Sequence, residues 1–457
     1  MRHTRFWHGA ALLATALAAA VAHALPDDAA VRTILEQRIE RKQGVGFAVV
    51  LVDQAGTRIV TAGRANAAGA PITADTEFEI GSITKTFTSL LLADAVLRDA
   101  VKLDQPVSQL LPAEWPPLAR DGKPVTLQQL ASHTSGLPPL PDNFKPANPD
   151  DPYVDYDATR LVAFLSGTPL QRVPGERYQY SNLGGGLLGY ALTRASGGYE
   201  ATLRARVLVP LGMNDTAVAL SPAQSARLAM GHRSDLSAAA NWNIGPTLAG
   251  AGELRSTASD MARYLRAAAG WDATPLAAAF KLAETPIADA GMPIMKVGLG
   301  WNIRQSDGKT VVWHNGGTGG YRSILLFDPA AREGVVVLAN ASISVDDLGA
   351  HLLDPSRKLA EPPRARTVAR VDPAVYDRLA GRYEVRPNFV LVVRRDGDRI
   401  LTQATGQDVV EIFPESDFEY FVKAFDARLS FRRDGAGAVT GLVLHQSGRD
   451  TPARRID

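Results

Sequence analysis

The chain has 457 residues, and its 49 Lys and Arg against 48 Asp and Glu leave a formal net charge of only +1. This balance, with no basic run, argues against a nucleic-acid-binding protein. Hydrophobic residues make up 46% of the chain and cysteine is absent, so we expect large folded domains with neither disulfides nor a cysteine-linked lipid anchor.

The first 24 residues have the pattern of a secretory signal peptide. Arg2 and Arg5 form a basic start, residues 9–21 are apolar, and a cleavage site of the Ala-x-Ala kind ends at Ala24. The apolar run is too short to span a bilayer. The alternative to a signal peptide is a short buried helix. We therefore predict a mature chain that begins near Leu25 and is periplasmic or secreted.

The next segment predicts a helix and a hairpin. Residues 27–41 carry apolar side chains at helical spacing. Residues 45–52 and 58–63 flank a Gln-Ala-Gly turn and are expected to pair. The first arm is apolar on both faces, so we predict that it is a central strand.

Strand patterns return only after a long middle region of helices and loops, which extends from Ser82 to about Leu265. The expected strands are 297–303, 310–314, 321–327 and 335–339, followed by a helix at 345–353. Because strands occupy both ends of this region, we predict one antiparallel sheet built from both ends. A helical insert would lie beside it, with a cleft between them.

A linker and a small β domain are expected at the end of the chain. Residues 355–372 hold three prolines and many charges. From residue 373, short alternating strands ending at 441–445 predict an antiparallel sheet or barrel of about eighty residues. The expected organisation is a signal peptide at 1–24, a domain at 25–354, the linker and a β domain at 373–457.

A Ser-x-x-Lys motif lies where an extended segment meets the helix expected at 82–98. Ser82 would stand at the helix N-terminus, with Lys85 one turn later on the same face. A lysine whose pKa is lowered can take the proton of a serine hydroxyl and activate it. The alternative is a helix cap followed by a surface lysine. A second copy, Ser306 to Lys309, holds an Asp-Gly turn between two apolar strands, which predicts a hairpin.

Tyr180 and Asn182 stand two residues apart in an extended piece, so their side chains are expected to point the same way. A phenol beside a lysine can relay a proton, and an amide can bond both the lysine and a substrate carbonyl. The alternative is an aromatic packing residue with an Asn cap. Glycines in the helix that follows would permit close approach of another backbone: Gly184, Gly185, Gly186 and Gly189.

A strand that ends at His314 runs into a glycine cluster that includes Gly316 and Gly317. Glycines leave a sheet edge bare, so a substrate backbone can lie against it, and His314 places a titratable group there. The alternative is a loose hairpin with a surface histidine. His133, among Ser and Thr residues, is expected to be structural.

Together, the Ser-x-x-Lys, Tyr-x-Asn and His-Asn-Gly motifs resemble the three signatures of serine β-lactamases and penicillin-binding proteins. The Tyr-x-Asn form is similar to the class C group, as are the segments 130–138, 174–182 and 210–213. The resemblance covers about residues 44–353, and the tail is similar to a lipocalin-like domain appended to some members. His314 replaces the Lys of Lys-Thr-Gly and looks more like the DD-peptidase, D-aminopeptidase and esterase branches.

The resemblance implies an α/β fold, in which an antiparallel sheet is flanked by helices with an all-helical subdomain, plus a small all-β C-terminal domain. It implies acyl transfer without a metal or cofactor. Ser82 would attack the carbonyl, and Lys85 and Tyr180 would share the base and acid roles. The oxyanion hole would be the backbone N–H groups of Ser82 and Gly317.

The resemblance also implies where a substrate binds. The substrate-binding residues would be Asn182, His314, Gly316 and Gly317. Asn182 would orient the substrate amide and His314 would bind the substrate carboxylate. An ordinary histidine pKa lies near 6.5, so carboxylate-bearing substrates should then be handled best in mildly acidic solution.

We therefore expect an exported serine hydrolase that acts on D-Ala-D-Ala-type peptides or β-lactams and has no nucleic-acid partner. The same residues fit an esterase on small acyl esters. A third possibility is a non-catalytic peptidoglycan-binding or sensor protein, which the intact Ser, Lys and Tyr disfavour.

Overall fold

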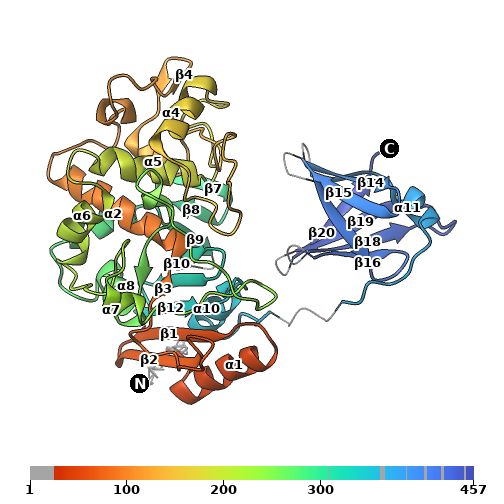
Figure 1. Cartoon of the computed structure of the whole chain (residues 1–457), viewed down its shortest axis with the longest axis horizontal. Coiled ribbons are helices and arrows are strands. Elements are labelled where there is room, and N and C mark those ends of the chain that lie inside the picture. The colour runs from red at the N-terminus through yellow and green to blue at the C-terminus, as the bar shows by residue number, and fades with distance from the viewer. Residues whose placement is uncertain are drawn as a thin grey trace, which may run out of the picture. The chain divides into compact units, whose positions relative to one another are not determined.

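The computed structural model describes residues 25–306, 308–360, 366–386, 389–405, 409–423, 427–446 and 449–457. The expected signal peptide and part of the expected linker lie outside these residues. The chain divides after Leu359 into two compact units (Figure 1). We call them the N-terminal and the C-terminal unit and describe each by itself.

The N-terminal unit is built on one antiparallel sheet, whose described strands follow the order β2-β1-β12-β11-β10-β9-β8-β7. The strands are β1 Gly46–Asp53, β2 Gly56–Gly63, β7 Ala288–Met292, β8 Met295–Val297, β9 Asn302–Ser306, β10 Lys309–Gly317, β11 Arg322–Asp328 and β12 Glu333–Ala339. Phe47 of β1 lies opposite Ala339 of β12, so the sheet joins both ends of the unit. The predicted central position of β1 is thus confirmed.

One strand prediction is wrong. The apolar run 297–303 is not a single strand, because Gly298 to Trp301 form a turn between β8 and β9. Gly300 has a φ of +70°, which glycine adopts without steric cost. In this turn Leu299 N–H donates to Ala283 O and Gly300 N–H donates to Ala131 O, so the turn binds helical segments rather than a strand.

Both faces of the sheet are covered by helices. Phe47, Val49 and Leu51 of β1 pack in a core with α1 (Asp28–Glu40) and α10 (Asp346–Leu353). The alternate residues Ala48 and Val50 belong to the larger core on the other face. An interior strand between two cores has no polar face, which explains its uniformly apolar sequence.

The larger core lies between the sheet and the helical part of the unit. Its helices are α2 Thr84–Leu97, α3 Leu127–Ala131, α4 Ala158–Gly167, α5 Asn182–Thr193, α6 Tyr199–Leu203, α7 Pro222–Ser225, α8 Ala258–Ala268 and α9 Ala277–Ala283. Shorter elements are β3 Phe78–Glu79, β4 Ala119–Arg120, β5 Lys123–Pro124, β6 Arg255–Ser256, single turns at Gly81–Ile83, Val107–Leu110 and Ala249–Ala251, and a π-helical turn at Arg204–Leu208. Every residue from Thr84 to Ala95 is buried, so α2 is enclosed on all sides.

The C-terminal unit is a closed antiparallel barrel with a short helix, α11 (Ala374–Leu379). Its strands are β13 Gly381–Arg386, β14 Phe389–Asp396, β15 Arg399–Ala404, β16 Val409–Pro414, β17 Glu419–Val422, β18 Ala427–Arg433, β19 Val439–Gln446 and β20 Arg449–Arg455. The barrel has its own core around Tyr383, Tyr420 and Phe431. Within the residues described in both units, no helix has the length and apolar character needed to cross a membrane.

The sequence does not predict α11 or β20. β20 holds charged residues and Pro452, and proline is disfavoured inside a sheet. The strand forms because it completes the barrel: Pro452 lies opposite Val443 of β19, and Tyr383 of β13 lies opposite Arg455. Closure of the barrel overrides the local pattern.

The separate cores predict that the N-terminal unit folds without the barrel. A chain that ends at Leu359 should show one cooperative thermal transition by circular dichroism, because both of its cores are complete at that residue. The full-length chain is the control. An insoluble product, or one that melts without a transition, would contradict this prediction.

Candidate active site

Ser82 lies in the turn Gly81–Ile83, between the short strand β3 and helix α2. β3 pairs with β6, and the N–H of Ile80 donates to Leu254 O at 3.0 Å. The predicted helix that starts at Ser82 is therefore a tight turn that continues as α2 from Thr84. Ser82 is held between two segments far apart in the sequence.

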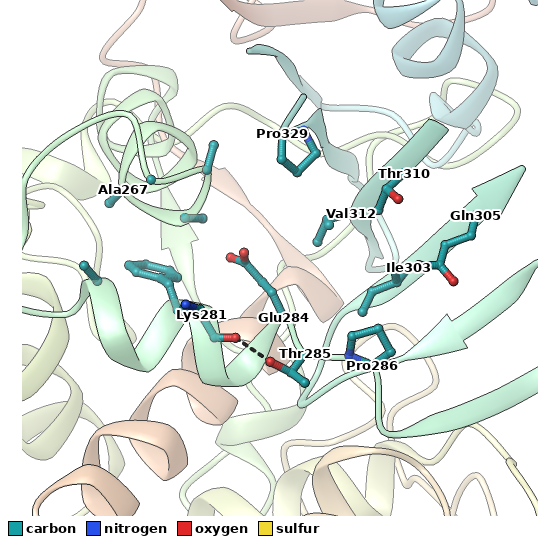
Figure 2. A pocket seen from close by; sticks show the side chains of 15 residues that line it. Ala267, Lys281, Glu284, Thr285, Pro286, Ile303, Gln305, Thr310, Val312 and Pro329 are labelled. Carbon is teal, nitrogen blue, oxygen red and sulfur yellow. Dashed lines mark hydrogen bonds between the residues drawn. The ribbon is translucent and has the colours of Figure 1, made fainter. Parts of the chain in front are cut away.

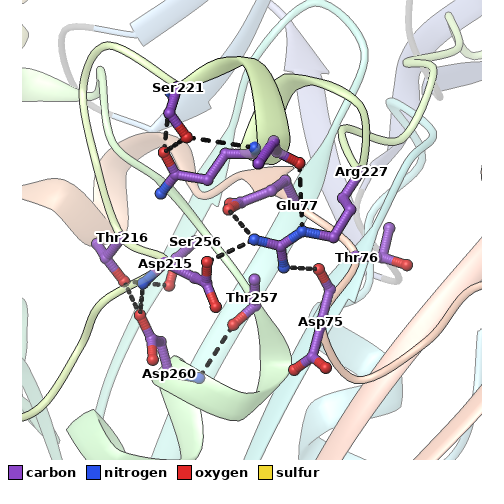
Figure 3. A network of polar contacts seen from close by, with 12 residues as sticks. Asp75, Thr76, Glu77, Asp215, Thr216, Ser221, Arg227, Ser256, Thr257 and Asp260 are labelled. Atoms are coloured by element: carbon purple, nitrogen blue, oxygen red, sulfur yellow. Dashed lines mark hydrogen bonds and ion pairs between the residues drawn. The ribbon is translucent and has the colours of Figure 1, made fainter.

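A polar network fixes the segment that leads into β3 (Figure 3). The Arg227 guanidinium donates to Asp75 O at 2.7 Å and to Asp215 Oδ1 at 2.5 Å, and lies 3.9 Å from Glu77 Oε1. Burial raises the pKa of Glu77 to about 8, although Arg227 opposes the shift. The segment before Ser82 is thus tied to the loop that carries Asp215.

Lys85 is buried with an exposed fraction of 2%. Its Nζ lies 2.9 Å from Ser82 Oγ, 2.8 Å from Asn182 Oδ1 and 2.5 Å from Ala251 O. Burial lowers the pKa of Lys85 to about 7, and no acidic side chain in the described residues offsets this effect. A large fraction of Lys85 is therefore neutral at neutral pH.

These neighbours orient the neutral amine. An uncharged –NH₂ group has two N–H donors and one lone pair, whereas Asn182 Oδ1 and Ala251 O can only accept. When the two acceptors take both N–H groups, the lone pair is left for the Ser82 hydroxyl. The geometry thus presents a basic lone pair to the proton of Ser82.

Tyr180 and Asn182 come to the same place from the start of α5. Ser181 caps this helix with its side chain, accepting from Gly184 N–H at 2.9 Å. The Tyr180 ring centroid is 5.0 Å from Lys85 Nζ. Burial raises the pKa of Tyr180, and a hydrogen bond with Ser82 partly opposes the shift, so Tyr180 keeps its proton at neutral pH.

The glycines of α5 make the close approach that the sequence predicts. A Cβ added to Gly185 would lie 3.1–3.3 Å from carbons of the Lys85 side chain, and one on Gly189 would lie 2.9 Å from Gly250 Cα. A larger residue at Gly185 would push α5 away from α2, and one at Gly189 would push it away from the turn Ala249–Ala251. The spacing of these helices sets the distance from Asn182 to Lys85.

The bare sheet edge lies at the end of β10. β9 pairs with β10 only from Lys309 to Trp313, so His314 to Gly317 extend past it. A Cβ on Gly316 would lie 2.0 Å from Ile80 O, and one on Gly81 would lie 2.5 Å from Gly317 N. This contact between two backbones brings the turn that carries Ser82 against Gly317.

His314 lies beside these residues, but its surroundings disfavour the positively charged ring that is expected from the sequence. Its ring centroid is 6.2 Å from that of Tyr180, and it is 2% exposed. Burial, aided by nearby Lys85, lowers the pKa of His314 to about 3. His314 Nδ1 lies 2.6 Å from Asn315 O, so the neutral ring carries its proton on Nδ1 and leaves the Nε2 lone pair free of a proton.

Two further aromatic residues belong to this cluster. Tyr153 forms a hydrogen bond with Asn182, and burial raises its pKa to about 12. The sequence reasoning missed Tyr153 because it lies in a proline-rich loop without periodicity. His133 packs against Tyr180 with centroids 4.4 Å apart, and its Nδ1 accepts from Ser181 N–H.

Trp242, which packs against Tyr153, also lines a pocket. The ring centroids of Trp242 and Tyr153 are 5.4 Å apart, and Trp242 and Gly319 line this pocket of about 240 Å³.

The second Ser-x-x-Lys copy is not part of the Ser82 cluster. Ser306 lies opposite Lys309 across the β9–β10 hairpin, as predicted. In the described part of the chain, no group of three or more His, Asp or Glu could hold a metal ion.

Two protein-family models match parts of the chain. A family model described as Beta-lactamase matches residues 31–354, and one described as a domain of unknown function (DUF3471) matches residues 365–454. The chain is 30% identical over 341 residues to the "Beta-lactamase" of Escherichia coli (strain K12). The aligned region covers 66% of this chain and 85% of that protein.

A second relative is the "D-alanyl-D-alanine-carboxypeptidase/endopeptidase AmpH" of the same organism, 29% identical over 282 residues, or 59% of this chain and 72% of that protein. The solved structure of the octameric penicillin-binding protein homologue from Pyrococcus abyssi has a TM-score of 0.64 at 23% identity, covering 94% of this chain and all of that one. The predicted fold and family resemblance are confirmed.

The contact of Gly81 with Gly317 predicts a sharp difference between two alanine variants. Gly81 and Gly69 both have positive φ, at +51° and +84°, but nothing lies within 4 Å of a Cβ on Gly69. Both variants carry similar backbone strain, of about 1–2 kcal/mol. Only Gly81→Ala must separate the Ser82 turn from β10.

We expect Gly81→Ala to react with a fluorophosphonate serine probe about a hundredfold more slowly, since displacements near 1 Å have effects of that size. Gly69→Ala should react at the wild-type rate. Circular dichroism checks that both variants fold. Equal rates for the two variants would show that the backbone contact does not position Ser82.

Proposed function

The chain belongs to the Beta-lactamase family of serine hydrolases, and on this basis we propose that it is an exported acyl-transfer enzyme acting on D-Ala-D-Ala-type peptides or β-lactams. The observation that carries the proposal is the 2.9 Å contact between Ser82 Oγ and the buried Lys85 Nζ. A lysine on the surface would keep its ordinary high pKa and could not take the proton of a neighbouring serine at neutral pH.

In the proposed acylation step, Ser82 Oγ attacks the substrate carbonyl carbon while its proton passes to Lys85 Nζ. Lys85 is favoured as the base over Tyr180, because burial lowers the pKa of the lysine and raises that of the phenol. The Tyr180 hydroxyl then passes a proton to the leaving amine and regains one from Lys85.

The developing oxyanion is proposed to bind the backbone N–H groups of Ser82 and Gly317. The close packing of Gly81 on Gly317 supports this placement. Removal of one oxyanion donor from a serine hydrolase raises the activation free energy of the reaction by about 2.7–4 kcal/mol. In the second step, water attacks the acyl-enzyme with the same base and releases Ser82.

The substrate backbone is proposed to lie along Gly316 and Gly317, with its amide bonded to Asn182. The contacts of Asn182 with Lys85 and Tyr153 hold its amide in one orientation. His314 contributes a neutral ring with a free Nε2 lone pair, rather than a cation. Its expected role as a charged carboxylate anchor is not part of the proposal.

The neutral His314 favours a second candidate function, hydrolysis of small acyl esters. A β-lactam or peptide carboxylate gains no ion pair from an uncharged imidazole, whereas a neutral ester needs none. Release of D-Ala from a D-Ala-D-Ala peptide, compared with turnover of a p-nitrophenyl ester, separates the two functions. The signal-peptide pattern at 1–24 supports the export part of the proposal.

The first test concerns the nucleophile. Ser82→Ala should abolish labelling by a fluorescent penicillin on a gel, because it removes the attacking oxygen. Ser306→Ala is the matched control, since Ser306 occurs in the same Ser-x-x-Lys pattern but lies in a hairpin, and it should label as the wild type does. Labelling that survives in Ser82→Ala would refute the assignment.

The second test uses pH. The labelling rate should rise with pH through about 7, because only the unprotonated Lys85 accepts the Ser82 proton. Since the pKa of His314 is lowered to about 3, its charge does not change between pH 5 and 8. The ratio of kcat/KM for a D-Ala-D-Ala peptide to that for a neutral ester should therefore stay constant there. A ratio that falls as pH rises through 6–7 would contradict the neutral state and indicate that a charged His314 binds the peptide carboxylate.

A further inference from the structure

A groove of about 500 Å³ lies outside the candidate active site, against the sheet (Figure 2). Ile303 of β9 and Val312 of β10 form one side, and Phe280 of α9 and the alanines at the end of α8 form the other. Its volume falls within the range of about 300–1,000 Å³ that is usual for small-molecule sites. None of its lining residues belongs to the Ser82 cluster.

The groove contains one acidic side chain, Glu284, which Figure 2 shows projecting between its walls. Glu284 Oε1 has no solvent exposure and no hydrogen-bond partner in the described residues. Glu284 also follows the last turn of α9, where the carbonyl ends of the helix disfavour negative charge. Because a buried acceptor without a donor is unfavourable, a ligand that donates a hydrogen bond to this carboxyl group would remove the cost.

The charged and titratable neighbours do not supply that partner. Lys281 also lines the groove, one turn earlier on α9, but it is exposed, and no ion pair joins it to Glu284 in the described residues. Tyr264 of α8 is a neutral phenol whose pKa Glu284 helps to raise. The polar residues that line the groove from the sheet, Gln305 and Thr310, are uncharged. Burial accordingly raises the pKa of Glu284 to about 9.

Apolar walls around an unpaired carboxyl select for a ligand with two features. An apolar body gains from leaving water, and a cationic group near the carboxyl favours its ionised form. We propose that this groove binds small amines in which a single cationic group is attached to an apolar body. The Glu284 carboxylate would accept charge-assisted hydrogen bonds from the ammonium group.

The test compares three probes of one shape: phenylbutylamine, phenylbutanol and phenylbutyrate. Isothermal calorimetry on the full-length protein measures their affinities in two buffers of different ionisation enthalpy, which also counts released protons. Glu284→Gln keeps the shape of the side chain and removes its charge. Glu36→Gln changes an exposed glutamate of α1 and is the matched control. Ala277→Phe fills the groove from an exposed lining position.

At pH 9, where Glu284 is substantially ionised, phenylbutylamine should bind at least about tenfold more tightly than phenylbutanol, since bonds to charged groups are the stronger ones, and phenylbutyrate should bind least. Glu284→Gln should remove this preference, Ala277→Phe should weaken all three probes, and Glu36→Gln should change nothing.

Proton linkage supplies an independent readout. Glu284 is protonated near pH 7 and an alkylamine stays charged to about pH 10, so binding should release about one proton. The affinity should rise by up to tenfold per pH unit towards pH 9 and then level off. Absence of phenylbutylamine binding, or equal affinity in wild type and Glu284→Gln, would overturn the proposal. These measurements do not depend on the activity of Ser82.

Discussion

The burial of Lys85 without a counter-ion is the constraint on which the rest of the site depends. An ammonium group in an apolar interior is costly, and its neighbours Ser82 Oγ, Asn182 Oδ1 and Ala251 O carry no charge. The group responds by losing its proton at an unusually low pH. A lysine thereby becomes a base under conditions in which surface lysines are fully charged.

The fold creates this environment by enclosing α2. Helices α9 and α5 and the turn Ala249–Ala251 pack on α2. Its buried stretch includes polar residues such as Thr86 and Thr88, which bond to neighbouring Tyr side chains. Glycines at Gly81 and Gly316 then let the turn before α2 touch the end of β10. The same close packing thus desolvates the proposed base and places the proposed oxyanion donors.

Local patterns predicted much of this structure. Helical spacing located α1 and α2, uniform apolarity identified β1 as central, and three short motifs in order identified the family. Properties that depend on contacts between distant segments were not predictable. Nothing near His314 indicates its burial against Lys85, no pattern marks Tyr153 as a partner of Asn182, and the polar strand β20 forms only because it closes a barrel.

The role of Lys85 as the base is tested most directly by its pKa, measured by NMR on protein labelled with ¹³C at the lysine ε-carbon. If Lys85 is the base, one lysine signal should titrate near pH 7 and be missing in Lys85→Arg, while the other lysines should titrate near their usual value of about 10.4. If every lysine titrates near 10, Lys85 is charged at neutral pH. It could not then serve as the base for Ser82.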